Sequence, residues 1–102
     1  MLALIKKWLG GNAVDFKALV NNGAVVVDVR SVPEYKAGHV SGSKNIPLDQ
    51  IRMKVADLKK LNKPVITVCR SGARSGAAKG ILKSAGIEVY NGGPWTSLKN
   101  KI

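Results

Sequence analysis

The sequence predicts an α/β fold of three layers, in which a central, mainly parallel sheet lies between helices. Segments with apolar residues at helical spacing alternate along the chain with short runs of β-branched residues. These runs are apolar on both faces, which is typical of buried parallel strands. The length of 102 residues, with 45% hydrophobic residues, suits a single globular core.

We expect an N-terminal arm over residues 1–11 and a single domain over residues 12–102. Asn12 is the expected N-cap of the first helix, and Asp15 is expected in its first turn, near the positive helix end. The apolar stripe of this helix consists of Phe16, Leu19 and Val20. The pair Asn22-Gly23 ends the helix, because glycine readily adopts a left-handed cap.

The next elements follow from the β-branched runs and from proline. Residues 24–29 are predicted to form a buried strand. A connecting segment then contains a short turn or helix at residues 33–36 and a brief strand at residues 45–47, which proline stops. Residues 49–61 are predicted to be a helix capped by Asp49. Its apolar residues share one face: Ile51, Val55 and Leu58.

A second buried strand is predicted at residues 65–68, directly before Cys69. A third helix is expected from Arg74, with Gly80 allowing close packing on the sheet. Its predicted buried stripe consists of Ala77, Ala78, Ile81, Leu82 and Ala85.

The last elements are a strand at residues 87–90, a turn at residues 91–94 and a short helix at residues 95–99. Gly86 is the expected cap before this strand. In doubly wound folds, ligands bind beyond the carboxyl ends of the strands. Cys69 stands at such an end, so the sequence predicts a functional site there.

The composition favours anionic partners. Seventeen Lys and Arg residues against six Asp and Glu residues give a net charge of +11, which raises the local concentration of small anions or nucleic acid. The chain has only two Trp, two Tyr and one Phe, so little surface is available for stacking bases. We therefore expect a small anionic ligand and no nucleic acid.

No stretch of the sequence is long enough to predict a membrane span. The segment 1–9 is apolar, but Lys6 and Lys7 follow its apolar run, which reverses the order of a signal peptide. We expect a cytoplasmic protein, with a leader removed upstream of Met1 in a longer chain as the alternative.

Cys69 is the only cysteine, which excludes a disulfide within the chain. A lone cysteine is either an inert core residue or a reactive thiol, and counting alone favours the inert one. One cysteine and one histidine make no zinc site, so no metal and no other cofactor is expected.

The residues around Cys69 favour a reactive thiol. Residues 65–76 have the pattern of a strand, a tight polar loop and a helix N-terminus. Small residues and Gly72 let the loop curl, so that its amides and the free amides of the helix form an anion nest. The positive helix end and the guanidinium groups of Arg70 and Arg74 should hold the pKa of Cys69 below the free value of about 8.5.

The same loop supplies the candidate substrate-binding residues. Arginine holds an oxyanion through two parallel hydrogen bonds, so Arg70 and Arg74 are the first candidates, with an exposed surface charge as the alternative for each. The full set expected to contact the substrate is Arg70, Ser71, Gly72, Ala73, Arg74 and Ser75.

The run CRSGARS at residues 69–75 resembles the active-site loop of rhodanese-like sulfurtransferases. The segment VDVRSVPEYKAGHVSGSKNIP at residues 27–47 is similar to the first signature of that family, and NGGPW at residues 91–95 is similar to its last. Ser41 and Ser43 depart from the commoner proline and alanine. Related phosphatases and arsenate reductases have a loop one residue longer between Cys and Arg, which disfavours their chemistry here.

The resemblance implies a thiosulfate sulfurtransferase. In that reaction the Cys69 thiolate takes the outer sulfur of a donor such as thiosulfate, sulfite leaves, and the persulfide passes its sulfur to cyanide, a thiol or a protein. The first alternative is a persulfide carrier that acts only with a dedicated protein partner. The second is a basic binding domain with an idle cysteine.

Four further residues are expected to serve structure. Asp28 and Arg30 lie at a strand end near the site, and we interpret them, together with Glu34, as one network of ion pairs and hydrogen bonds that orders the loops. His39 is the only histidine and invites the role of a general base. Because it lies in the first signature and outside the loop, we expect a structural hydrogen bond from it.

Overall fold

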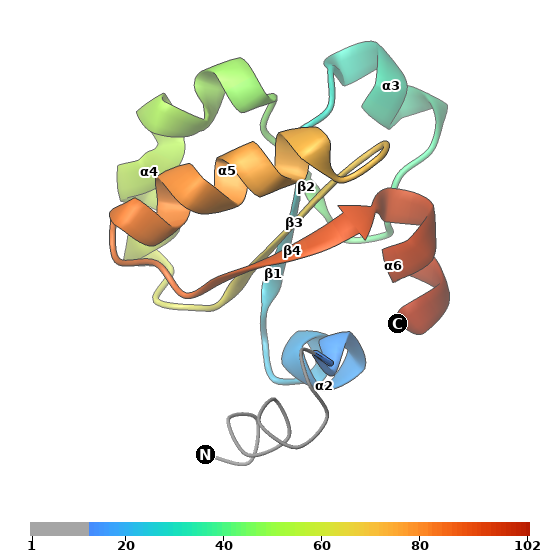
Figure 1. Ribbon diagram of the computed structural model, residues 1–102, viewed down its shortest axis with the longest axis horizontal. Helices are drawn as coiled ribbons and strands as arrows, with labels where there is room; N and C mark the ends of the chain where they lie inside the picture. The colour runs from blue at the N-terminus through green and yellow to red at the C-terminus, as the bar shows by residue number, and fades with distance from the viewer. Residues whose placement is uncertain (1–12) are drawn as a thin grey trace.

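A sheet of four parallel strands runs through the middle of the molecule (Figure 1). The computed structural model describes residues 13–102, and the strand order is β2-β1-β3-β4. The strands are β1 (Val25–Asp28), β2 (Lys44–Asn45), β3 (Val65–Cys69) and β4 (Val89–Pro94). Every neighbouring pair is parallel, which confirms the predicted sheet.

Helices cover both faces of this sheet, as the sequence predicts. They are α2 (Phe16–Asn21), α3 (Val32–Ala37), the 3-10 turn η1 (Leu48–Gln50), α4 (Ile51–Lys60), α5 (Ala73–Ser84) and α6 (Trp95–Lys101). Figure 1 shows α4 and α5 together on one side of the strands and α2 and α6 on the other. In the described part of the chain, no helix is long and apolar enough to cross a membrane.

The central strand β3 explains the three layers. All five of its residues are buried, and alternate side chains point to opposite faces of the sheet. Val65 and Cys69 pack in the core beneath α4 and α5, together with Ile51 and Leu82. The side chains on the other face form a second core: Phe16, Val26, Val40, Ile66, Val68 and Leu98.

Two predicted helix caps are wrong. Asp15 lies one residue before α2 and is its N-cap, accepting a hydrogen bond from the amide of Ala18 at 3.0 Å. Asn12, which the sequence predicted as this N-cap, and the predicted arm over residues 1–11 lie outside the described residues. Asp49 caps no helix, because the chain enters α4 through η1, and the side chain of Gln50 makes no capping bond.

The predicted stripe of α5 also needs correction. Ala78 and Leu82 are buried, but Ala77 is exposed and Ser75 is buried instead. Gly80 does not serve close packing, since a Cβ at that position would meet nothing within 4 Å. The first turn of α5 therefore faces the end of β3 with a polar side chain, which bears on the functional site.

The predicted turn at residues 91–94 is instead the second half of β4. The strand continues through Pro94 with a bulge opposite Thr67 and Val68. Gly92 is needed there because a Cβ would lie 2.9 Å from side-chain carbons of both Ile66 and Val68. The glycine pair thus reflects close packing between neighbouring strands and not a chain reversal.

Candidate active site

The candidate site is the loop between β3 and α5, at the carboxyl end of the sheet (Figure 1). Cys69 ends β3, and Gly72 is the N-cap of α5. Gly72 has a φ of 104°, a left-handed conformation that glycine adopts without steric cost. This turn directs the amide of Gly72 back toward the sulfur of Cys69.

Two backbone amides and one hydroxyl surround that sulfur. Sγ of Cys69 accepts a hydrogen bond from the amide of Gly72 at 2.9 Å and from the amide of Ser75 at 3.3 Å. The hydroxyl of Ser75 also lies 3.3 Å from Sγ. The side chain is fully buried, so the sulfur belongs to the core and to a ring of inward-facing amides at once.

These contacts determine the pKa of Cys69. Burial is the strongest single influence and by itself raises the pKa. Hydrogen bonds from the Ser75 hydroxyl and from the amides of Ser75, Gly72 and Ser71 together outweigh burial and lower the pKa below its ordinary value. Hydrogen bonding is therefore the physical cause of the lowered pKa. The sequence prediction relied instead on the guanidinium charge of Arg70 and Arg74.

Asn91 completes this network, although the sequence analysis placed it in a turn. Its Oδ1 lies 2.7 Å from the hydroxyl of Ser75 and accepts the amide of Gly93 at 2.9 Å. Its Nδ2 donates to the carbonyl of Gly72 at 3.3 Å. The strand that contains Asn91 explains its position. Because β4 is the parallel neighbour of β3, the carboxyl ends of both strands lie at the same edge of the sheet.

Arg74 is held by an ion pair with Glu34. Nη1 and Nη2 of Arg74 donate to the two carboxylate oxygens of Glu34 at 2.8 and 3.0 Å. The hydrogen bond from Arg74, followed by bonds from Ser31, holds the pKa of Glu34 far below its usual range. No residue of α3 is buried, and this ion pair links the helix to the first turn of α5.

Glu34 therefore does not belong to one network with Asp28 and Arg30, as the sequence prediction had it. The guanidinium of Arg30 makes a separate buried ion pair with Asp28 at 2.7 Å. The same guanidinium donates to the carbonyl of Gly38 at 2.7 Å and lies 4.7 Å from the ring of Trp95. The two groups have different neighbours, since Glu34 of α3 pairs with Arg74 of α5 and Arg30 lies beside Trp95 of α6.

His39 contacts Tyr35 of α3. Its Nδ1 lies 2.8 Å from the carbonyl of Tyr35, and its ring stacks on the ring of Tyr35 with centroids 3.8 Å apart. The side chain is exposed and has no bond to Cys69. This geometry agrees with a structural hydrogen bond and offers no path for a proton from the sulfur.

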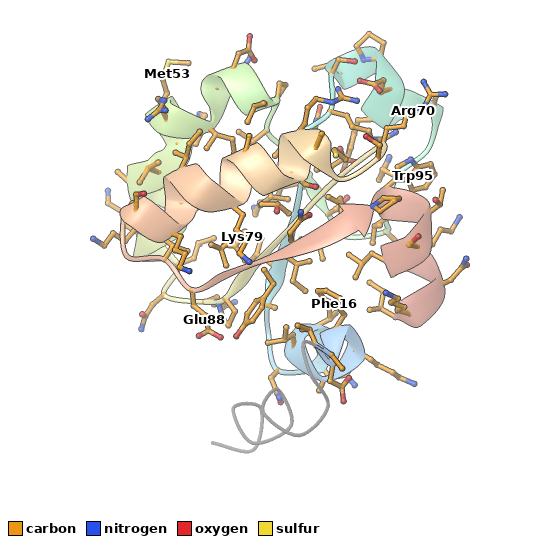
Figure 2. All side chains as sticks on the ribbon, in the orientation of Figure 1. Phe16, Met53, Arg70, Lys79, Glu88 and Trp95 are labelled. Atoms are coloured by element: carbon orange, nitrogen blue, oxygen red, sulfur yellow. The ribbon has the colours of Figure 1, made fainter. Side chains whose placement is uncertain are left out.

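The remaining loop residues lie on the surface. Arg70, Ser71 and Ala73 are exposed, whereas Arg74 is half-buried. In Figure 2, Arg70 and Trp95 lie at the end of the molecule where the loop, α3 and the start of α6 gather. Among residues 13–102, no group of three His, Cys, Asp or Glu side chains is placed to hold a metal ion.

Residues 12–94 match the family model described as the rhodanese-like domain. This chain belongs to the rhodanese-like sulfurtransferase family. The chain is 40% identical over 78 residues to the thiosulfate sulfurtransferase GlpE of Pseudomonas fluorescens, covering 74% of this chain and 69% of that one. It is 35% identical over 92 residues to the thiosulfate sulfurtransferase PspE of Escherichia coli, covering 88% of each.

Two further comparisons concern coverage and fold. The chain is 38% identical over 69 residues to the uncharacterised protein YqhL of Bacillus subtilis, covering 67% of this chain and 54% of that protein, so it spans about half of that relative. A solved structure described as rhodanese with anions from E. coli superposes with a TM-score of 0.65 and 36% identity. That match covers 74% of this chain and 91% of the other, and the predicted family is confirmed.

The rhodanese-like loop predicts how the thiol ionises. Because the folded-state pKa of Cys69 is lowered, the thiolate should persist as the pH falls through the range in which a free thiol becomes protonated. Ser75→Ala removes one donor to the thiolate, which is expected to move the titration midpoint upward by about half a pH unit to one pH unit. Thiolate absorbance in the ultraviolet, corrected with a Cys69→Ala blank, measures this without requiring access to the buried sulfur.

Ser84→Ala is the matched control for this measurement. Ser84 is an exposed serine near the other end of α5, and its hydroxyl donates to the carbonyl of Gly80. The Ser84→Ala variant should leave the titration midpoint of Cys69 unchanged. A midpoint in the Ser75→Ala variant at or below that of the unmodified protein would contradict the assignment of Ser75 as a donor to the thiolate.

Proposed function

We propose that this protein moves sulfane sulfur from a donor such as thiosulfate to a thiophilic acceptor through a persulfide on Cys69. The observation that supports the proposal is the convergence of the Gly72 amide, the Ser75 amide and the Ser75 hydroxyl on Sγ. Such a ring stabilises negative charge on sulfur, and both the thiolate and the persulfide carry that charge.

In the first half-reaction, the thiolate of Cys69 attacks the outer sulfur of thiosulfate. A new S–S bond forms with Sγ, the S–S bond of the donor breaks, and its electron pair leaves with sulfite. The sulfur of Cys69 carries one negative charge before the step, and the terminal sulfur of the persulfide carries it afterwards. No proton needs to move, so this step requires no general base.

In the second half-reaction, an acceptor attacks the terminal sulfur of the persulfide. Cyanide gives thiocyanate, a thiolate gives a new persulfide, and in both reactions Sγ leaves as the thiolate that began the cycle. Because the donor product departs before the acceptor reacts, the kinetics should be ping-pong. A single cysteine suffices, since no resolving thiol within the chain takes part.

The helix and the arginines supply the remaining charge. The 12-residue helix α5 directs its positive end at the sulfur. Arg74 binds Glu34 end-on through Nη1 and Nη2. Its Nε is left without a hydrogen-bond partner among the described residues. We assign this free edge of Arg74, together with the exposed Arg70, to the sulfonate oxygens of the donor.

Arg74→Ala is expected to weaken donor binding more than turnover. Loss of a charge-assisted hydrogen bond should raise KM for thiosulfate about tenfold, with a smaller change in kcat. Steady-state rates at varied thiosulfate and fixed cyanide measure both. Arg52→Ala, an exposed arginine on α4, is the control and should change neither. A normal KM in Arg74→Ala would exclude this role for Arg74.

Glu34→Gln separates binding from structure in this experiment. It weakens the ion pair that fastens α3 but keeps the guanidinium of Arg74. If the role of Arg74 is to hold the donor, Glu34→Gln should raise KM much less than Arg74→Ala does. Equal increases in both variants would instead assign the effect to the position of α3.

A persulfide carrier that serves only a protein partner is the second candidate. The observation that favours it is the complete burial of Cys69, since a free acceptor must reach a covered sulfur. Intact mass spectrometry should show the mass of one added sulfur after thiosulfate and its removal by cyanide. Steady-state formation of thiocyanate supports the turnover enzyme, whereas loading without sustained turnover supports the carrier.

A further inference from the structure

The hydroxyl of Ser75 has more acceptors within reach than it has protons. Its Oγ lies 2.7 Å from Oδ1 of Asn91, 3.1 Å from the carbonyl oxygen of Gly72 and 3.3 Å from Sγ of Cys69. A serine hydroxyl carries one proton and accepts through two lone pairs. The proton can therefore point at only one of these three acceptors at a time, and the contact with Asn91 is the shortest.

The side-chain amide of Asn91 is fixed in one orientation. Its oxygen accepts the amide of Gly93, and its nitrogen donates to the carbonyl of Gly72. The opposite orientation would set its NH₂ against the amide of Gly93 and its oxygen against the carbonyl oxygen of Gly72. Asn91 therefore presents an acceptor to Ser75, and the proton in their 2.7 Å contact comes from Ser75.

We propose that Asn91 is a positioning residue, which controls the ionisation of Cys69 by competing with its sulfur for the Ser75 proton. With a neutral thiol, the S–H donates to the Ser75 oxygen and Ser75 donates to Asn91. When the thiol loses its proton to solvent, Ser75 keeps its own proton and turns it from Asn91 to the thiolate. The consequence for sulfur transfer rests on the proposed function, but the proton arrangement does not.

The charged groups near this edge of the sheet stay the same when the Ser75 proton changes its orientation. They come from the loop, α5, β1 and its extension, α3 and η1, and include Lys79, which lies between α5 and β4 in Figure 2: Arg70, Arg74, Lys79, Asp28, Arg30, Glu34 and Asp49. Asp28 and Glu34 are both held in ion pairs with arginines. On β4 the titratable group is Tyr90, where the carboxylate of Glu88 raises the pKa to about 12. None of these groups is bonded to Asn91.

The test is the titration midpoint of Cys69 in four proteins: unmodified, Asn91→Ala, Ser75→Ala and the double variant. Removing the competing acceptor should lower the midpoint by about half a pH unit to one pH unit, the value of one hydrogen bond. In the Ser75→Ala background, Asn91→Ala should have no effect, because the hydroxyl that transmits it is gone. Asn91→Leu, which keeps the branching and the number of heavy atoms of the side chain, should act like Asn91→Ala.

Asn100→Ala, an exposed asparagine on α6, is the matched control and should leave the midpoint unchanged. Asn91 is itself exposed, so its variants should stay folded, which thermal unfolding verifies. An unchanged or raised midpoint in both Asn91 variants would overturn the proposal, as would an equal decrease with and without Ser75. Since the readout is thiol titration, this result is independent of whether the protein transfers sulfur.

Discussion

Cys69→Ala is expected to abolish sulfur loading completely. Thiosulfate should add no mass to the variant, and thiocyanate formation should fall to the rate without protein, because the nucleophile and the carrier of sulfur are the same atom. The experiment is unusually clear in this chain, since its full sequence contains no second cysteine that could accept sulfur. Intact mass spectrometry before and after thiosulfate is the measurement.

The stability of this variant is the necessary control. Cys69 packs in the core beneath α5, and its replacement by alanine removes only the sulfur atom. We expect the free energy of unfolding to fall by about 1 kcal/mol, an amount typical of small core truncations. Cys69→Ser, which keeps the volume closer, should be equally inactive. Sulfur loading or unchanged biological function in either variant would favour a binding domain with an idle cysteine.

The strands of this fold were predictable because their signal is local. The buried positions of β1 and β3 require apolar, β-branched side chains on both faces, and VVV and VITV carry that requirement in the sequence itself. The position of Cys69 follows from the same reasoning, since neighbouring residues predict the strand, the curled loop and the start of the helix. The order of the strands then places the loop at the edge of the sheet.

What the sequence could not show are contacts between segments far apart in the chain. Gly92 resembles a turn residue, and only its neighbours Ile66 and Val68 in β3 reveal that it permits close packing. In the same way, Glu34 and Arg74 are 40 residues apart, and nothing local pairs them. Asn91 was missed for this reason too, because its role depends on the distance between β4 and the first turn of α5.

Arg30→Met is expected to give a large loss of stability although it lies outside the loop. The guanidinium of Arg30 binds both carboxylate oxygens of Asp28, and neither side chain is more than 5% exposed. Methionine keeps much of the apolar stem but leaves the Asp28 carboxylate buried without its partner. An uncompensated buried charge of this kind should lower the free energy of unfolding by about 3–5 kcal/mol, which urea denaturation measures.

The exposed Arg52 provides the matched control, since Arg52→Met should change the free energy of unfolding by no more than about 0.5 kcal/mol. A double variant, Asp28→Asn with Arg30→Met, has no buried charge at these two positions and should be more stable than Arg30→Met alone. If the double variant is no more stable, the cost comes from lost contacts of Arg30 with Gly38 and Trp95. In either result, lost sulfur transfer in Arg30→Met would report a displaced loop and would not make Arg30 a catalytic residue.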